Sequence, residues 1–233
     1  DIYPLKMQFM EKFYARFKES KDKKRQEEYK AYCEREGAEL EKLAVFLAMY
    51  EERCHSVWGG WRAWEEKYRS PSNPAVKEYA EEHKDRVGFF KFLQFEADRQ
   101  FKEAADEVKK KGLKIGFYRD LAVGVGQDSA ESWSNPDIFI AESGAGAPPD
   151  ACFPGGQKWG LGAFNPYVLK QKAYEPFIQI LRANMRNTGA LRIDHVMSLM
   201  RLYVIPNEGK QGTYIMYNFA DMLNIVAIES YLN

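Results

Sequence analysis

The glycines of this 233-residue chain are distributed unevenly, and their distribution divides the chain into two parts. Only four of the 17 glycines precede residue 112, and that first part is rich in charged side chains. Charged sequence with little glycine favours long helices, whereas glycine and proline gather where strands alternate with turns and loops. We therefore predict a helical subdomain over residues 1–111 and a mixed segment of helices and strands over residues 112–233.

Apolar side chains recur at helical spacing through residues 1–111, which predicts successive amphipathic helices. Residues 21–35 are expected to form a charged, solvated helix. Asn73 followed by Pro74 supplies a cap residue and then proline at the first helical position, so a helix should begin there. The last helix of this part should end at Gly112, which follows three lysines where the helix dipole favours cations.

Residues 112–233 are expected to contain two short strands that end in charged residues. The first covers residues 113–118 and ends at Arg119 and Asp120, and the second covers residues 190–194. A long loop and then a helix, which Gly189 should stop, lie between them. This order is typical of a βα-barrel, in which residues at the ends of the strands carry the chemistry. The predicted fold class is therefore α/β, as part of a (β/α)8 barrel with a large, mainly helical insertion.

Charge and cysteine content exclude several classes of function. Lys and Arg together number 34, as do Asp and Glu, so no overall field attracts nucleic acid or an anionic membrane surface. No apolar run approaches the length of a membrane span. The three cysteines, Cys33, Cys54 and Cys152, lie far apart and share no ligand spacing with histidines, which predicts a reducing, cytoplasmic location and no metal site. The oligomeric state is not indicated.

Aromatic residues make up 15% of the chain, which suits either a large core or a ligand with flat apolar faces, such as a sugar. Trp58, Trp61 and Trp64 have no polar partners nearby in the sequence, so we favour packing within the helical part. Trp159 lies in an expected loop between glycines. It could fix that loop to the barrel or stack under a pyranose ring, with the Gln157 amide available for sugar hydroxyls.

Arg192, Asp194 and His195 form the cluster with the clearest chemical potential. Residues two apart in a strand share a face, so Arg192 and Asp194 should point the same way. A guanidinium favours the ionised form of a neighbouring carboxylate, and an anionic carboxylate can attack an oxocarbenium-like sugar carbon. On these residues alone, a structural ion pair is the more common outcome. Asp120 could likewise cap its own loop or bind a sugar hydroxyl.

Several motifs, standing in one order, resemble those of the 4-α-glucanotransferase family. They are IGFYRDLAVGV (residues 115–125), GAPPD (146–150), GQKWGL (156–161), FNP (164–166), LRANM (181–185) and GALRIDHVM (189–197). The likeness extends through the whole chain. It implies a (β/α)8-barrel enzyme that moves α-1,4-glucan segments from a maltodextrin donor to a maltodextrin acceptor by retaining double displacement, without a cofactor.

The resemblance also implies a role for each residue that matches a family motif. Asp194 would be the nucleophile and Arg192 the residue that orients it. The substrate would be bound by His195 at the cleavage subsite, by Asp120, by Gln157 and Trp159 in a loop over the glucan, and by Asp150 at the base of that loop.

The acid/base glutamate of the family belongs to a motif expected beyond Asn233. Glu229 does not match it, and its helical pattern with Ile225 and Ile228 predicts a surface or capping residue. Because glycoside chemistry of this kind needs two carboxyl groups, the 233 residues alone are expected to be an inactive segment of the enzyme.

Two other functions remain open at this point. A retaining α-glucan hydrolase would share the nucleophile but release glucose and maltose alone from maltotriose. A non-catalytic glucan-binding or helical interaction module would bind maltodextrin even after Asp194→Ala and would show no activity.

Overall fold

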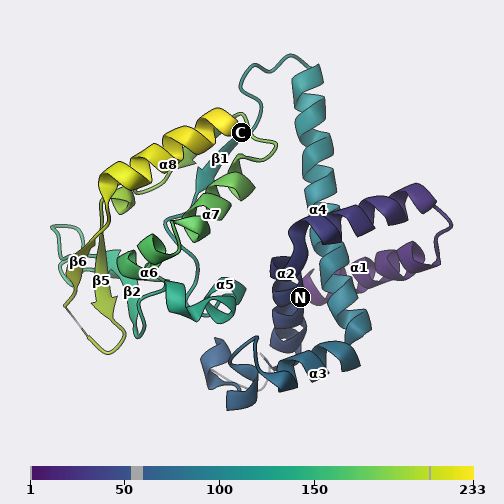
Figure 1. The fold of residues 1–233 in the computed structure, drawn as a ribbon, viewed down its shortest axis with the longest axis horizontal. Helices are drawn as coiled ribbons and strands as arrows, with labels where there is room; N and C mark the ends of the chain where they lie inside the picture. The colour runs from purple at the N-terminus through teal and green to yellow at the C-terminus, as the bar shows by residue number, and fades with distance from the viewer. Residues whose placement is uncertain (1, 54–59, 210) are drawn as a thin grey trace. The chain divides into compact units, whose positions relative to one another are not determined.

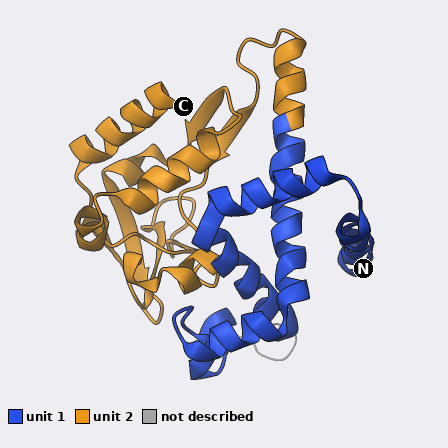
Figure 2. Cartoon of the chain, turned by 45° about the vertical axis from the view of Figure 1, so that its right-hand side comes forward, with its two compact units in different colours: residues 1–102 blue, residues 103–233 orange. Residues whose placement is uncertain are grey.

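The computed structural model describes residues 2–53, 60–209 and 211–233 (Figure 1). The chain forms two compact units, residues 1–102 and residues 103–233, and the boundary falls inside a long helix (Figure 2). Within the described residues, no helix combines the length and the apolar character that a membrane span requires.

The first unit is entirely helical in its described part. Its elements are α1 (Ile2–Glu19), α2 (Lys23–Arg53), the 3-10 turns η1 (Gly60–Ala63) and η2 (Glu66–Tyr68), α3 (Pro74–Glu82) and most of α4 (Lys84–Lys110). The predicted helix start is confirmed, because the Asn73 side chain accepts a hydrogen bond from the Ala75 amide and Pro74 is the first helical residue. The predicted end is confirmed as well, since Gly112 follows α4 with a φ of 78°.

Helix α2 covers most of the charged helix predicted over residues 21–35. It begins two residues later, at Lys23, and continues to Arg53. Gly37 interrupts its helical backbone with a φ of 57° and a ψ of −135°. This combination of angles is open mainly to glycine, so Gly37 marks the point where the exposed first part of α2 gives way to its buried second part.

Aromatic side chains from three helices form the core of the first unit. Phe17 of α1 lies 4.9 Å from Phe92 of α4 and 5.2 Å from Tyr29 of α2, measured between ring centroids. Trp61 and Trp64 are buried, and Trp64 packs against Phe46 of α2, which confirms the packing role predicted for these two tryptophans. Trp58 lies outside the described residues.

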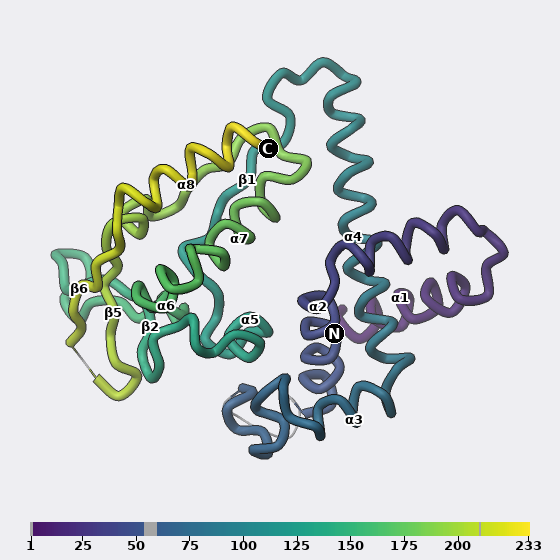
Figure 3. Tube along the Cα trace, viewed as in Figure 1, coloured from purple at the N-terminus to yellow at the C-terminus, as the bar shows by residue number. Residues whose placement is uncertain are grey.

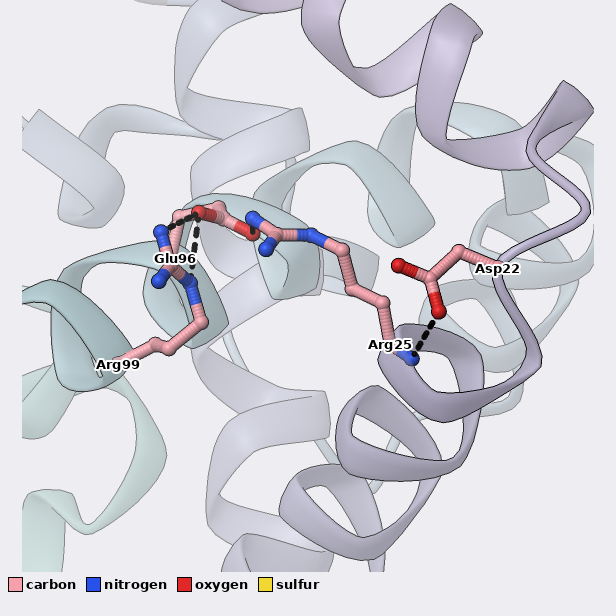
Figure 4. Close-up of polar contacts among 4 residues, drawn as sticks. All are labelled: Asp22, Arg25, Glu96 and Arg99. Atoms are coloured by element: carbon pink, nitrogen blue, oxygen red, sulfur yellow. Dashed lines mark hydrogen bonds and ion pairs between the residues drawn. The ribbon is translucent and has the colours of Figure 1, made fainter.

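An ionic cluster joins α2 to α4 beside this core (Figure 4). Glu96 of α4 accepts a hydrogen bond from Arg25 of α2 at 2.5 Å and from the guanidinium of Arg99 at 3.1 Å. The Asp22 carboxylate caps the start of α2 by accepting from the Arg25 amide. These contacts fix the first turn of α2 against α4.

The second unit contains two separate sheets and the helices that pack on them. Its elements are β1 (Tyr118–Leu121), α5 (Ala130–Ser134), η3 (Pro136–Ile138), β2 (Ser143–Ala147), β3 (Gln157–Leu161), α6 (Pro166–Gln171), α7 (Glu175–Met185), β4 (Ala190–Ile193), η4 (Val196–Leu199), β5 (Arg201–Pro206), β6 (Thr213–Met216) and α8 (Phe219–Leu232). Strands β1 and β4 pair in parallel, and the other four form an antiparallel sheet in the order β3-β2-β5-β6.

The first strand differs from its prediction. Residues 113–117 are not in a strand, and Leu113 and Ile115 are exposed. The parallel ladder with β4 begins with Tyr118 opposite Ala190, so β1 starts at Tyr118. Asp120 is therefore inside the strand and not beyond its end.

The prediction of a long loop after the first parallel strand is also wrong, because that segment contains β2 and β3, two strands of the antiparallel sheet. Strand β2 consists of serine, glycine and alanine, and glycine and alanine are depleted in strands. Its small residues are required by packing, since a Cβ at Gly146 would lie 2.1 Å from the Gln157 carbonyl oxygen of β3. Helix α7 ends at Met185, four residues before the predicted stop at Gly189.

Candidate active site

Asp120, Arg192 and Asp194 form one hydrogen-bonded cluster at the parallel strands. The register of β1 and β4 places Asp120 directly opposite Arg192. Nη1 of Arg192 donates to Oδ2 of Asp120 at 3.0 Å, and Nη2 donates to Oδ1 of Asp194 at 2.9 Å. The prediction that Arg192 and Asp194 point the same way is confirmed, and the structure adds Asp120 as a second carboxylate on the same guanidinium.

The backbone holds Asp194 at the end of β4. Its amide donates to the Leu121 carbonyl at 3.3 Å, which continues the strand pairing by one residue. His195 then turns the chain with a φ of 46° and a ψ of 57°, in the left-handed region that few residues other than glycine adopt. The chain leaves the strand immediately after Asp194, so its carboxylate lies at the strand end.

The electrostatics of the cluster are dominated by Arg192. Hydrogen bonding to Asp120, with the charges of Asp120 and Asp194, raises the pKa of the Arg192 guanidinium above its ordinary value. All three side chains are about half exposed, with 50% for Arg192, 56% for Asp120 and 52% for Asp194, so a ligand can reach both carboxylates.

Trp159 and His195 meet in the structure. Their ring centroids lie 5.2 Å apart at an interplanar angle of 82°, an edge-to-face contact. Nε1 of Trp159 donates to Oε1 of Gln157 at 3.2 Å. Both Gln157 and Trp159 belong to β3, so the prediction that they lie in a loop is wrong. The strand brings these two residues to the turn that follows Asp194.

Asp150 has a local structural role. Its Oδ1 accepts hydrogen bonds from the amides of Cys152 at 2.8 Å and Phe153 at 2.6 Å, and its own amide donates to the Phe153 carbonyl. These contacts close the turn between β2 and β3. They connect Asp150 to its own loop and not to the Arg192 cluster.

Asp120 and Asp194 line a cavity of about 260 Å³. The other walls are mostly apolar. They include residues 122–125 after β1, Phe177, Ile180 and Asn184 of α7, and Met222 of α8. The two carboxyl residues thus adjoin a space whose shape depends on the helices packed around the parallel strands.

The prediction that Glu229 is a surface residue is wrong, because the residue is buried. Its side chain is 4% exposed and accepts hydrogen bonds from Nε and Nη2 of Arg182, both at 2.8 Å. Arg182 hydrogen bonding lowers the pKa of the Glu229 carboxyl. No sequence signal indicated this pair, because its members lie 47 residues apart. Within residues 2–53, 60–209 and 211–233, no three His, Cys, Asp or Glu side chains are grouped as metal ligands.

Comparison with known proteins gives the family of this chain. The family model described as 4-alpha-glucanotransferase matches residues 1–232. The 4-alpha-glucanotransferase of Haemophilus influenzae is 41% identical over 177 residues, which are 75% of this chain and 25% of that protein. The 4-alpha-glucanotransferase of Mycobacterium bovis is 35% identical over 205 residues, 87% of this chain and 28% of that protein. The chain therefore spans about a quarter of the length of these relatives.

Solved structures agree with these relatives. The amylomaltase of Corynebacterium glutamicum matches all of this chain and 30% of its own, with a TM-score of 0.80 and 28% identity. The amylomaltase of Streptococcus agalactiae in complex with acarbose matches 95% of this chain and 45% of its own, with a TM-score of 0.84 and 19% identity, which shows a common fold. The mixed helix and strand class is thereby confirmed. Because the family model covers nearly the whole length, this chain belongs to the 4-alpha-glucanotransferase family.

Proposed function

We propose that this chain supplies the nucleophile-bearing part of a 4-α-glucanotransferase, which transfers α-1,4-glucan segments between maltodextrins. The observation that carries the proposal is the Asp120–Arg192–Asp194 cluster, in which one guanidinium binds two half-exposed carboxylates beside a cavity. The names of the relatives, which are 41% and 35% identical to this chain over the aligned residues, support the transfer reaction.

Asp194 is the proposed nucleophile. Arg192 binds its Oδ1, and among the described residues no donor binds Oδ2, which is therefore the oxygen available for attack. In the first step Oδ2 forms a bond to the anomeric carbon, the glycosidic bond breaks, and an acid elsewhere in the protein protonates the leaving sugar. In the second step the 4-hydroxyl of an acceptor displaces Asp194 and gives its proton to the same acid/base residue. Two inversions give net retention.

The proposed roles of the remaining site residues combine the family resemblance with their contacts in the structure. Asp120 shares Arg192 with Asp194 and offers a second carboxylate for sugar hydroxyls. His195 faces the sugar at the cleavage subsite, and Trp159 and Gln157 supply an indole and an amide from β3. Asp150 holds the turn at the base of that strand. No cofactor takes part in this proposal.

The same proposal extends to the architecture. Strands β1 and β4 are parallel neighbours, as consecutive strands of a (β/α)8 barrel are, and we assign them to such a barrel. Residues 1–111 would be a helical insertion into it, and residues 112–233 the barrel segment with the nucleophile strand. The acid/base glutamate would come from a strand that follows this chain in the longer relatives. A cytoplasmic location is part of the same proposal.

The test is maltotriose disproportionation by a full-length 4-α-glucanotransferase that contains this chain. The unaltered protein should form glucose and longer dextrins, and Asp194→Asn should lower the rate on the order of 10⁴-fold or more. Asp137→Asn, which alters an exposed carboxylate paired with Lys172, is the matched control and should retain the activity.

Three results would contradict the proposal in different ways. Unchanged activity in Asp194→Asn would remove Asp194 as the nucleophile. Glucose and maltose as the sole products would identify a hydrolase. Maltodextrin binding that survives Asp194→Ala, in a full-length protein without any activity, would identify a glucan-binding module.

A further inference from the structure

Two polar pairs connect α7 to α8. The Tyr174 hydroxyl, at the start of α7, donates to Oδ2 of Asp221 in the first turn of α8 at 2.7 Å. Eight residues further along each helix, Arg182 binds Glu229. Both pairs span 47 residues, so the two helices run parallel with matched positions over roughly 12 Å. Figure 3 shows α7 and α8 alongside each other in this direction.

The Arg182–Glu229 pair differs from the many exposed ion pairs of the chain. Its carboxylate is buried, and both of its oxygens accept hydrogen bonds from Arg182. Asn233 donates a further hydrogen bond to Oε2 at 3.1 Å. A buried ion pair is weak evidence for a gain in stability, because apolar residues of similar volume often serve equally well. A bidentate guanidinium–carboxylate pair does, however, fix both a distance and an angle.

The parallel strands leave little freedom between α7 and Asp194. Four residues follow Met185 before β4 begins. At their end, the amides of Gly189 and Ala190 both donate to the Phe117 carbonyl, at 2.9 and 3.2 Å. A movement of α7 therefore acts on β4 at a point four residues before Asp194.

The cavity beside Asp194 connects the helices to the site more directly. Phe177 and Ile180 of α7 and Met222 of α8 line it together with Asp120 and Asp194. On α7, Phe177 lies between Tyr174 and Arg182. On α8, Met222 lies between Asp221 and Glu229, directly after Asp221. The spacing of α7 and α8 therefore contributes to the width of the space that adjoins the two carboxylates.

We propose that Arg182 and Glu229, supported by Tyr174 and Asp221, are positioning residues that hold the Asp194 carboxylate in place by fixing α7 against α8. The proposal rests on the proposed function of Asp194. It requires that geometry at Asp194 changes when the pair is broken, even though neither Arg182 nor Glu229 touches the cavity or the Arg192 cluster. Small displacements of a nucleophile lower the rate of the chemical step more than they weaken substrate binding.

The experiment compares Glu229→Gln and Arg182→Lys with the unaltered full-length enzyme in maltotriose disproportionation. Kinetics are measured well below the melting temperature of each variant, where near-UV circular dichroism shows a native spectrum. We expect kcat to fall roughly tenfold to a hundredfold in Glu229→Gln with KM within about twofold. Arg182→Lys keeps the charge and one hydrogen bond, so it should lose less. Lys170→Met, which removes an exposed cation from α6, is the control and should leave both constants unchanged.

A second measurement does not depend on activity. Hydrogen exchange in residues 186–194 should become faster in Glu229→Gln and stay unchanged in Lys170→Met. Unchanged kcat in both pair variants, or a rise in KM alone, would overturn the positioning role while leaving the proposed function intact. If the unaltered enzyme shows no transfer, the proposed function fails, and exchange at residues 186–194 still tests the connection between the helices and the strand.

Discussion

Gly189→Ala gives the sharpest stability test of the parallel strand pair. A Cβ at this position would lie 1.3 Å from the Ile115 carbonyl oxygen and 2.5 Å from its carbonyl carbon. The atoms it meets belong to the backbone and not to a flexible side chain, so the two segments would have to separate by about 2 Å to reach ordinary contact. That separation breaks the hydrogen bonds from Gly189 and Ala190 to the Phe117 carbonyl.

The magnitude follows from these contacts. Two backbone hydrogen bonds contribute about 1 kcal/mol each, and forced overpacking costs about 1–3 kcal/mol. We expect Gly189→Ala to lower the free energy of unfolding by about 3–5 kcal/mol. With a urea dependence of about 1–3 kcal/mol per molar, the midpoint should fall by roughly 2 M.

The assay is urea unfolding of the purified chain, followed by circular dichroism, with hydrogen exchange of β1 and β4 to locate the effect. Gly155→Ala is the matched control, since a Cβ at Gly155 meets no atom within 4 Å. It should change the free energy of unfolding by less than about 1 kcal/mol. Equal midpoints for Gly189→Ala and Gly155→Ala would refute the reasoning, because only Gly189→Ala creates a steric conflict with the backbone.

Three further predictions concern single interactions. Asn73→Ala should cost about 1 kcal/mol through loss of the α3 cap, seen as a lower melting temperature of the first unit, and an unchanged value would contradict the cap. Leu181→Ala removes a fully buried side chain of α7 and should cost about 2–5 kcal/mol in urea unfolding; a cost below 1 kcal/mol would contradict tight packing there. Since Arg182 lowers the folded-state pKa of Glu229 below its ordinary 4.5, the stability that this carboxylate contributes is present above pH 4.5 and is lost as the pH falls through the folded value. The advantage of the unaltered chain over Glu229→Gln should therefore shrink in urea titrations at progressively lower pH, and a constant difference would contradict the charged pair.

Local signals predicted the parts of the structure that depend on neighbouring residues. The cap at Asn73, the glycine after α4 and the shared direction of Arg192 and Asp194 all follow from spacing within a few residues. Each of them depends on the local backbone conformation, which is set by residue types only a few positions apart.

The features that the sequence did not predict depend on residues far apart in the chain. Strand β2 is a run of small residues that becomes a strand because β3 and β5 approach closely on either side of it. The start of β1 is set by where β4 offers partners. Glu229 looked like a surface residue because Arg182, which makes its burial tolerable, precedes it by 47 residues.

The matched spacing of the Tyr174–Asp221 and Arg182–Glu229 pairs has a consequence for the tolerance of the protein to insertions and deletions. Each residue added to a helix rotates the following side chains by about 100°. One residue inserted between Tyr174 and Arg182, or between Asp221 and Glu229, would turn one partner away from the other. Residues added between β5 and β6 lie outside both intervals and leave both pairs intact. Length variation among natural or engineered versions should therefore collect in that hairpin and be absent from the two helical intervals.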